Sequence, residues 1–185
     1  MNAELESDSD QLLSIRQDAL GLMSGLSDTQ FNWQPEPGRW SMAGCFDHLN
    51  KSAAHLFIRN IDTAIATATA QGLKSAGPFA YSALERWAVR TNDAPAKTRF
   101  KAPKNVQPVS SLRLDEVRIE FVRWQDEIAA RLRQADGLDL RRAKYTWPFW
   151  PLKWSLGATF QLILAHERRH VWQARNVRQS PGFPS

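Results

Sequence analysis

The sequence predicts an all-α protein built as a four-helix bundle, and three observations lead to this prediction. Four long segments repeat apolar residues at the three- and four-residue spacing that places them on one face of a helix. The stretches between them are rich in proline and glycine, which interrupt helices. The 185 residues suit one domain with a full-sized core. We therefore treat residues 1–185 as a single domain with a loose tail at 179–185.

The first helix is expected over residues 9–26. Leucine, isoleucine and alanine form one stripe along it, and Ser7 or Ser9 can cap its start. Ser27 and Gln30 have the spacing of a capping box, which predicts a short helical turn. The proline- and glycine-containing run at 33–40 is expected to be a loop.

The second helix is expected over residues 42–70, with Ser41 as its cap and an apolar stripe that runs from Met42 to Ile61. Residues 71–109 form a long connection, in which 80–91 are expected to make a short helix. A connection of this length is not a tight turn between antiparallel neighbours. It predicts a crossover between the second and third long helices.

The third helix is expected over residues 111–135, where the apolar stripe from Leu114 to Leu132 is unbroken. Residues 136–153 are expected to be a loop that ends in an aromatic run from Tyr145 to Trp154. Such a run is more typical of a packed collar than of a ligand cage, although one run can serve as both. The fourth helix follows over residues 154–178.

The fourth helix carries the most informative pattern of the chain. Its core-facing stripe changes from hydrocarbon to polar side chains halfway along, in the order Leu156, Phe160, Ile163, His166, His170 and Gln173. Imidazoles four residues apart lie one above the other and can reach the same metal ion. Without partners, buried histidines would cost on the order of 1–3 kcal/mol each. We prefer this interpretation to two surface histidines, because Arg168 and Arg169 fall on the outward positions.

His-Glu-Arg-Arg-His at 166–170 also has the zincin spacing, in which two histidines bind zinc and the glutamate is the general base. A zincin needs a third ligand further along the chain, and residues 171–185 contain no His, Asp or Glu. The third ligand must therefore come from upstream. His48, beside the stripe of the second helix, is the candidate.

The depths of these histidines in their helices predict the topology. His48 lies roughly 10 Å from the start of its helix, and His166 and His170 lie roughly 12–18 Å from the end of theirs. The depths match when the second and fourth helices are antiparallel. The long crossover supplies the connection that this arrangement needs. We therefore predict up-down-down-up order.

With Trp40-Ser41 before the second helix, His48 early in it, and the terminal pattern from His166 to His170 and Gln173, the chain resembles the DinB-like superfamily. That group includes YfiT-like proteins and thiol-dependent S-transferases. The resemblance covers nearly the whole chain. It implies an up-down-down-up bundle that holds a divalent metal, commonly zinc or nickel, on three histidines. It also implies hydrolysis, thiol transfer or isomerisation as activities, the thiol being a low-molecular-weight one.

Three histidines would leave an open position on the metal, which is typical of catalytic sites. The neighbours of the histidines allow several roles. Glu167 is expected to form a salt bridge or support a ligand, with general base as the minority alternative, and Gln173 to orient a substrate or form an interhelical hydrogen bond. Cys45 is a fourth ligand, a nucleophile or a small buried residue, and the last is the default. His55 lies too far along the helix, roughly 10 Å from His48, to bind the same ion.

Composition narrows the class of protein. The polar, acidic N-terminus is not a signal peptide, no apolar run is long enough to span a membrane, and a single cysteine suits a reducing compartment. We therefore expect a cytoplasmic protein with no membrane partner. The net charge is +5, and the denser basic patch is more typical of a solvated face than of a nucleic-acid site. It comprises Arg131, Arg133, Arg141, Arg142 and Lys144.

The leading hypothesis is a metal-dependent enzyme that hydrolyses a small molecule or transfers a thiol to it. The alternative is a non-catalytic metal-binding or stress-associated interaction module. Nucleic-acid binding through the basic patch is a third hypothesis, which lacks a recognition motif. We expect a small-molecule substrate as the partner, no nucleic acid, and consider a homodimer as the assembly.

Overall fold

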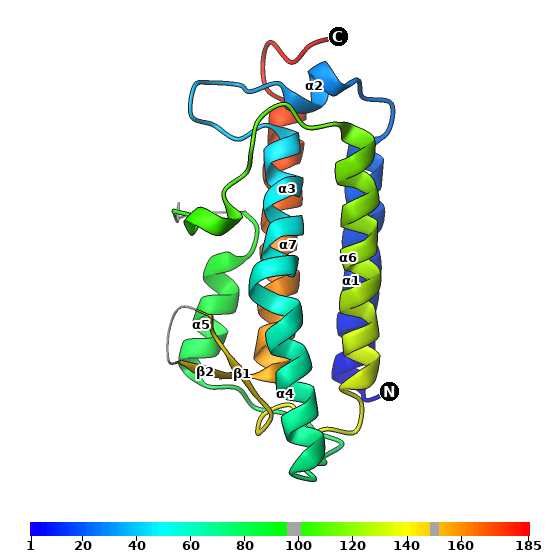
Figure 1. Ribbon diagram of the computed structural model, residues 1–185, viewed down its shortest axis with the longest axis vertical. Coiled ribbons are helices and arrows are strands. Elements are labelled where there is room, and N and C mark those ends of the chain that lie inside the picture. Colours follow the sequence, from blue (N-terminus) through cyan, green and yellow to red (C-terminus); the bar gives the residue numbers. More distant parts are fainter. Residues whose placement is uncertain (96–100, 149–151) are drawn as a thin grey trace.

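The computed structural model describes residues 1–95, 101–148 and 152–185, and this part of the chain is mostly helical (Figure 1). The long elements are α1 (Ala3–Met23), α3 (Met42–Ser52) with its continuation α4 (Ile58–Ala70), α6 (Leu114–Gln134) and α7 (Leu156–Arg178). Shorter elements are α2 (Asp28–Asn32), α5 (Ala83–Asn92), the turn η2 (Lys104–Val106), and the strands β1 (Lys144–Thr146) and β2 (Lys153–Ser155). The prediction of an all-α bundle fold is confirmed apart from this small hairpin.

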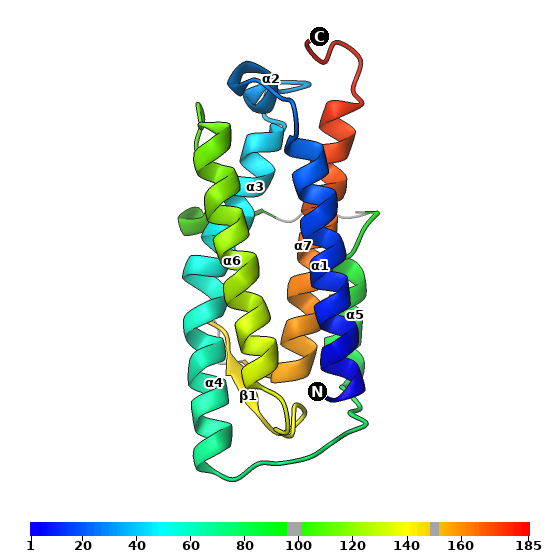
Figure 2. The same cartoon turned by 90° about the vertical axis from the view of Figure 1, so that its right-hand side faces the viewer.

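Contacts between the helix ends fix the direction of each helix. The amide of Asn2, before α1, donates to Asp136, after α6, so these two helices are antiparallel. Lys74, after α4, pairs with Leu138, so α4 and α6 end at the same side of the molecule. Arg178, at the end of α7, donates to the carbonyl of Leu22, at the end of α1. Figures 1 and 2 show the resulting path, with α1 and α7 running one way and α3–α4 and α6 the other.

The helices enclose one main core. α3 packs against α7 and α6, and α1 packs against the same two helices from the other side. Apolar residues from each of these helices form a single buried cluster, which includes Leu12, Phe46, Phe121, Phe160 and Ile163. The apolar stripes read from the sequence therefore face one another, and burial of such side chains is the main stabilising term of a fold of this size.

The first helix begins earlier than predicted. Asn2, and not Ser7 or Ser9, is its cap, and the Asn2 side chain accepts a hydrogen bond from the amide of Leu5. Asp8 is buried on the same face as Leu5 and Leu12. Because this polar residue lies on the core face, the apolar stripe in the sequence starts later than the helix does. The capping box of Ser27 and Gln30, at the start of α2, is present as predicted.

The second helix is not the continuous α-helix predicted over 42–70. The π-helical turn η1 (Ala53–Phe57) separates α3 from α4, and in it the amide of Ile58 bonds to the carbonyl of Ala53, five residues back. The extra residue turns the following side chains to a different face. His55 is exposed in consequence and does not share the buried face of His48. The cap at Ser41 is present, because its hydroxyl accepts from the amide of Gly44 at 3.0 Å.

The segment predicted as a loop over 136–153 contains β1 and joins β2. The two strands are antiparallel, with Tyr145 opposite Trp154. The alternation of aromatic and polar residues in Lys-Tyr-Thr and Lys-Trp-Ser is the signal that identifies a hairpin, and we read it as a collar instead. Tyr145 and Trp154 are buried, as a collar requires. Phe149, Trp150 and Pro151 of the aromatic run lie outside the described residues.

The crossover runs from the end of α4 to the start of α6 along one side of the bundle (Figure 1). Its helix α5 covers 83–92 instead of 80–91, and residues 96–100 lie outside the described part of the chain. α5 packs against α7. The Glu85 carboxylate anchors it there by accepting from the amide of Ser155 at 2.7 Å. Burial alone would raise the pKa of Glu85, but hydrogen bonds to its carboxylate, this one among them, lower the pKa to about 2.

The chain after α7 is in contact with the bundle, although we expected a loose tail at 179–185. The ring of Phe183 lies edge-on to Trp33 with 5.6 Å between centroids, and Gln30 donates to the carbonyl of Pro184. None of the helices that the structure describes combines the length and the apolar character that a membrane crossing requires.

Candidate metal centre

The three histidines chosen from the sequence meet between α3 and α7. The Nε2 atom of His166 lies 3.1 Å from Nε2 of His48 and 3.1 Å from Nε2 of His170. All three ligand atoms lie within 4.8 Å of one another. His48 and His170 are each 5% exposed, and His166 is half-buried. The antiparallel arrangement of α3 and α7, inferred from the depths of these residues, brings them together.

One histidine has its ring nitrogens assigned by a backbone contact. The Nδ1 atom of His48 lies 2.7 Å from the carbonyl oxygen of Val106 in η2. A carbonyl only accepts, so Nδ1 carries the proton and Nε2 presents a lone pair to the other two rings. Metal-binding histidines are commonly oriented by a hydrogen bond of this kind. Sequence reasoning missed Val106, because a backbone carbonyl leaves no signal in residue identity.

The geometry fits a shared divalent ion. Zinc binds imidazole nitrogens at about 2.0–2.1 Å, and three such nitrogens on one ion are roughly 3.0–3.4 Å apart for bond angles between right and tetrahedral. The two distances of 3.1 Å fall within that interval. A single proton on Nε2 of His166 can be donated well to only one of its two neighbours, so hydrogen bonds within the cluster leave one of the three nitrogens without a good partner. A cation removes this conflict.

The electrostatics keep the rings neutral, which is the form that binds metal. Burial lowers the pKa of His48, although the hydrogen bond to Val106 opposes this effect. Burial, and after it the neighbouring His48 and the positive charge of Arg169, together lower the pKa of His166 to about 3. The pKa of His170 falls well below its usual value for the same reasons, burial first.

Aromatic rings lie on both sides of the cluster. The ring of Trp40, just before α3, lies 4.9 Å from that of His48 and is stacked at 5.6 Å on that of His170. Phe57, in η1, lies 6.2 Å from His166. Trp147 is in turn 6.3 Å from Phe57. Of these rings, sequence reasoning assigned Phe57 only to the core stripe and Trp147 only to the collar.

Among the described residues Glu167 has no salt-bridge partner, although a salt bridge was one of the two main roles expected of it. It is 4% exposed, and its Oε1 accepts from Nε2 of Gln125 in α6 at 2.8 Å. Burial raises the pKa of Glu167 to about 8, while the hydrogen bond from Gln125 and the charge of Arg168 act in the opposite direction. The side chain therefore contacts α6, and with this pKa its carboxyl holds a proton at neutral pH.

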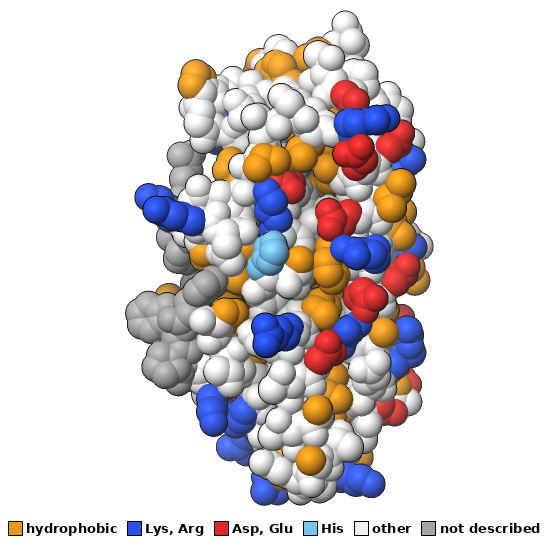
Figure 3. All heavy atoms as spheres, viewed as in Figure 1, with side chains coloured by type: hydrophobic (Ala, Val, Ile, Leu, Met, Phe, Trp, Pro, Cys, Tyr) orange, Lys and Arg blue, Asp and Glu red, His pale blue; other side chains and the backbone are white. Residues whose placement is uncertain are grey.

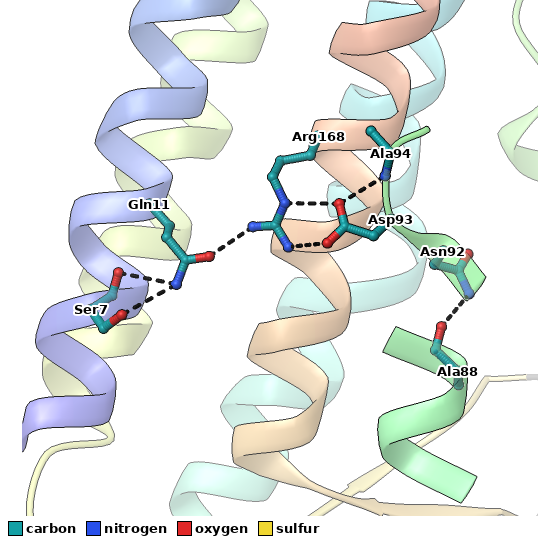
Figure 4. Close-up of polar contacts among 7 residues, drawn as sticks. All are labelled: Ser7, Gln11, Ala88, Asn92, Asp93, Ala94 and Arg168. Atoms are coloured by element: carbon teal, nitrogen blue, oxygen red, sulfur yellow. Dashed lines mark hydrogen bonds and ion pairs between the residues drawn. The ribbon is translucent and has the colours of Figure 1, made fainter. Parts of the chain in front are cut away.

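The two arginines predicted to face outward are not in solvent. Arg168 donates to both carboxylate oxygens of Asp93, at 2.9 and 2.7 Å, and to the side chain of Gln11 at 2.8 Å (Figure 4). It thereby joins α7 to α1 and to the segment after α5. Arg169 is only 5% exposed and donates to the carbonyl of Thr91. The sequence predicts a short helix close to α5 but does not reveal that this helix packs on α7 and covers this face.

The remaining candidates divide clearly. Gln173 is half-buried, and a hydrogen bond between its side chain and His170 acts to raise the pKa of that ring. Cys45 is 1% exposed, belongs to the main core and is not part of the histidine cluster. Burial raises the pKa of its thiol to about 12. His55 is exposed and also lies outside the cluster.

The basic patch is smaller than the sequence suggested. Arg131 is engaged in ion pairs with Asp62 and Glu127, so it is not part of an open basic surface. Arg141, Arg142 and Lys144 line an open hollow of about 550 Å³ together with Asp139. Figure 3 shows basic side chains at the lower end of the molecule in that view.

The antiparallel helices α3 and α7 bring three neutral histidines to one point. The class of protein is therefore a helical bundle with a candidate metal centre. The sequence matches the DinB superfamily over residues 11–174, which is most of the chain, and the chain belongs to this superfamily. No curated protein and no solved structure matches it. The family expected from His48 and the His166–His170 pattern is thus confirmed.

Proposed function

We propose that the protein binds one divalent metal ion on His48, His166 and His170 and is a metal-dependent enzyme for a small molecule. The reaction would be a hydrolysis or the transfer of a low-molecular-weight thiol. The observation that carries the proposal is the convergence of three Nε2 atoms, with no carboxylate or thiol joining them among residues 1–95, 101–148 and 152–185. Structural zinc sites normally have four protein ligands, whereas catalytic sites have three and an open position.

Zinc or nickel is the metal we propose, since both accept imidazole ligands. A divalent ion with an open position supplies Lewis acidity, which lowers the pKa of a bound water or thiol and polarises a carbonyl. The protein residues contribute orientation and charge. The Val106 carbonyl holds His48 in place, and Gln173, which contacts His170, is placed to orient a bound group. Glu167 is unsuited to act as general base, because it contacts Gln125 in α6.

The test begins with the metal content of protein purified without added metal, then stripped with a chelator and reloaded with zinc or nickel. We expect about one ion per chain. A panel of esters, amides and thiol acceptors is then assayed with stripped and reloaded protein. Turnover that needs metal supports an enzyme. Stoichiometric metal without turnover on the panel would favour the alternative, a non-catalytic metal-binding or stress-associated module, and absence of metal binding would reject both.

A small-molecule substrate, a cytoplasmic location and a homodimer remain parts of this proposal. The single, fully buried cysteine is compatible with a reducing compartment. Sedimentation of the purified protein tests the dimer, and fractionation of the source cells tests the location.

A further inference from the structure

The aromatic residues beside the histidine cluster leave one histidine more accessible than the others. Trp40 covers His48 and His170, each 5% exposed, whereas His166 is half-buried. In the described part of the chain, the ring of Phe57 lies 6.2 Å from that of His166. A molecule that approaches the metal site past His166 therefore meets an aromatic surface first.

This aromatic surface is fixed by a specific contact. The carbonyl of Leu56, in the π-helical turn η1, accepts a hydrogen bond from the hydroxyl of Tyr145 in β1 at 2.6 Å. Tyr145 packs edge-on against Trp147, with ring centroids 5.4 Å apart, and Trp147 packs edge-on against Phe57. The π-helical turn and the hairpin thus hold each other, and together they place Phe57 beside His166 and Trp147 beside Phe57. π-helical turns occur frequently at functional sites.

The charges around the cluster favour an anionic ligand. Asp47 is next to His48 in sequence, but its carboxylate accepts from Lys51 at 2.7 Å and from the amide of Val109 at 3.0 Å. The positive charge of Arg169 acts on both His166 and His170. A divalent ion on three neutral imidazoles retains its full charge, and this adds to the charge of Arg169. The site attracts a negatively charged head group.

We infer that the substrates of this protein are aromatic or similarly apolar molecules with an anionic metal-binding head. This inference rests on the proposed metal site. The head binds at the position next to His166, and the apolar part reaches Trp147, which is half-buried and packs on the buried Phe57. Trp147 and Phe57 are then specificity-determining residues. Their rings offer the stacking and edge-on contacts that aromatic ligands prefer.

The probes are hydroxamates, which carry an anionic metal-binding head on different side groups. Protein loaded with cobalt(II) is titrated with acetohydroxamate and with benzohydroxamate, and binding is followed by the visible absorption of the metal. Burial of one phenyl group predicts a benzohydroxamate Kd about 10- to 100-fold lower. Benzamide, which has the ring without the anionic head, should leave the spectrum unchanged.

Two variants test the residues. Trp147→Ala and the conservative Phe57→Leu should each bind acetohydroxamate as the wild type does and lose most of the preference for benzohydroxamate. Trp87→Ala, which removes an indole that is 54% exposed on α5, is the matched control and should keep the preference. Cobalt content and far-UV circular dichroism show that each variant is folded and loaded.

The outcomes separate this inference from the proposed function. Cobalt binding with equal affinity for the two hydroxamates overturns the aromatic specificity and leaves the metal site intact. A preference that survives in both Trp147→Ala and Phe57→Leu overturns the assignment of these residues. Failure of the wild type to bind cobalt overturns the metal site and this inference with it.

Discussion

Two polar side chains on neighbouring residues of α7, the half-buried His166 and the buried Glu167, show two different ways to keep polar atoms inside a protein. His166 turns toward α3, where its Nε2 meets the Nε2 atoms of His48 and His170 at 3.1 Å. Glu167 turns toward α6, where it pairs with Gln125 at 2.8 Å. Both groups are buried enough to shift their pKa values strongly, His166 down to about 3 and Glu167 up to about 8.

The two groups differ in the hydrogen-bond partners of their polar atoms. A proton makes Glu167 neutral and the amide of Gln125 donates to its Oε1, although Oε2 of Glu167 and Oε1 of Gln125 have no partner in the described part of the chain. The three imidazoles are neutral as well, yet their converging nitrogens lack a donor for each lone pair, and Nδ1 of His166 has no partner in the described part of the chain. Burial of a polar group without a partner costs about 1–3 kcal/mol. The histidine cluster is thus compatible with a bound cation, whereas the Glu167 pair offers no such set of converging ligands.

The largest effect is expected when one histidine is removed, because this tests directly whether the cluster binds a metal ion. His170→Ala should lower metal affinity by more than the roughly 10- to 100-fold typical of losing an orienting partner, because it deletes a ligand itself. Metal content after dialysis, measured by mass spectrometry, should fall from about one ion per chain to near zero. His55→Ala, which changes an exposed histidine, is the control and should retain the metal. Full occupancy in the His170 variant would refute the shared site.

The success of sequence reasoning differed between these regions for a physical reason. The histidines interrupt an apolar stripe at helical spacing, and that pattern survives folding, so His48, His166 and His170 could be found and matched in depth. The environment of Glu167 depends on Gln125, which is 42 residues away on another helix. No local pattern reports such a contact. The position of Arg169 depends on α5, whose docking on α7 is equally non-local.

The errors in the fold have similar causes. The π-helical turn at 53–57 adds a residue without changing the apolar character of the segment, so periodicity alone does not reveal it. The hairpin is short, and its aromatic residues suit a packed loop as well as strands. Asp8 on the core face of α1 hid the first turns of that helix, since a carboxyl reads as a solvent residue. Each miss is a tertiary effect that overrides a local preference.

A second buried carboxyl tests whether a proton is the way in which this bundle tolerates acidic residues. Asp8 is 2% exposed, and its pKa is raised from 3.8 to about 7, chiefly by burial and then by the charge of Glu4, against the effect of Arg168. A raised pKa in the folded state contributes stability below pH 3.8 that is lost as the pH rises through 7. Asp8→Asn should therefore become more stable than the wild type with rising pH, by on the order of a few kcal/mol above pH 7.

The measurement for Asp8→Asn is urea unfolding of both proteins from pH 4 to pH 9. The difference in free energy of unfolding should be small at pH 4, grow through the interval and level off above pH 7. Asp10→Asn on the exposed face of α1 provides the control, for which we expect no such trend. A difference that stays constant over this range would mean that Asp8 does not hold a proton in the folded protein.

A smaller effect is expected for Glu167→Gln. Below pH 8 the glutamate is protonated, so an amide of the same shape replaces a neutral acid, and the free energy of unfolding at pH 7 should change by less than about 1 kcal/mol. Metal content should be unchanged, because Glu167 faces Gln125 and not the histidines. Loss of metal in this variant would show that the carboxylate supports the cluster, and the contrast between the two faces of α7 would fail.

The smallest effect is expected for Cys45→Ser, which tests whether the thiol is a further ligand of the histidine cluster. Cys45 lies one helical turn before His48, but it is 1% exposed within the apolar core, and burial raises the pKa of its thiol to about 12. A metal-bound thiol would be deprotonated outright, which this apolar surrounding disfavours. Cys45→Ser should therefore keep its metal, and its stability should fall by only about 1 kcal/mol, because a serine hydroxyl in a helix can bond to the carbonyl four residues back. Metal content and thermal unfolding, each with and without chelator, give the answer. Metal loss from this single change would mean that the thiol closes the coordination shell, which would make the site structural and remove the open position on which the enzyme proposal rests.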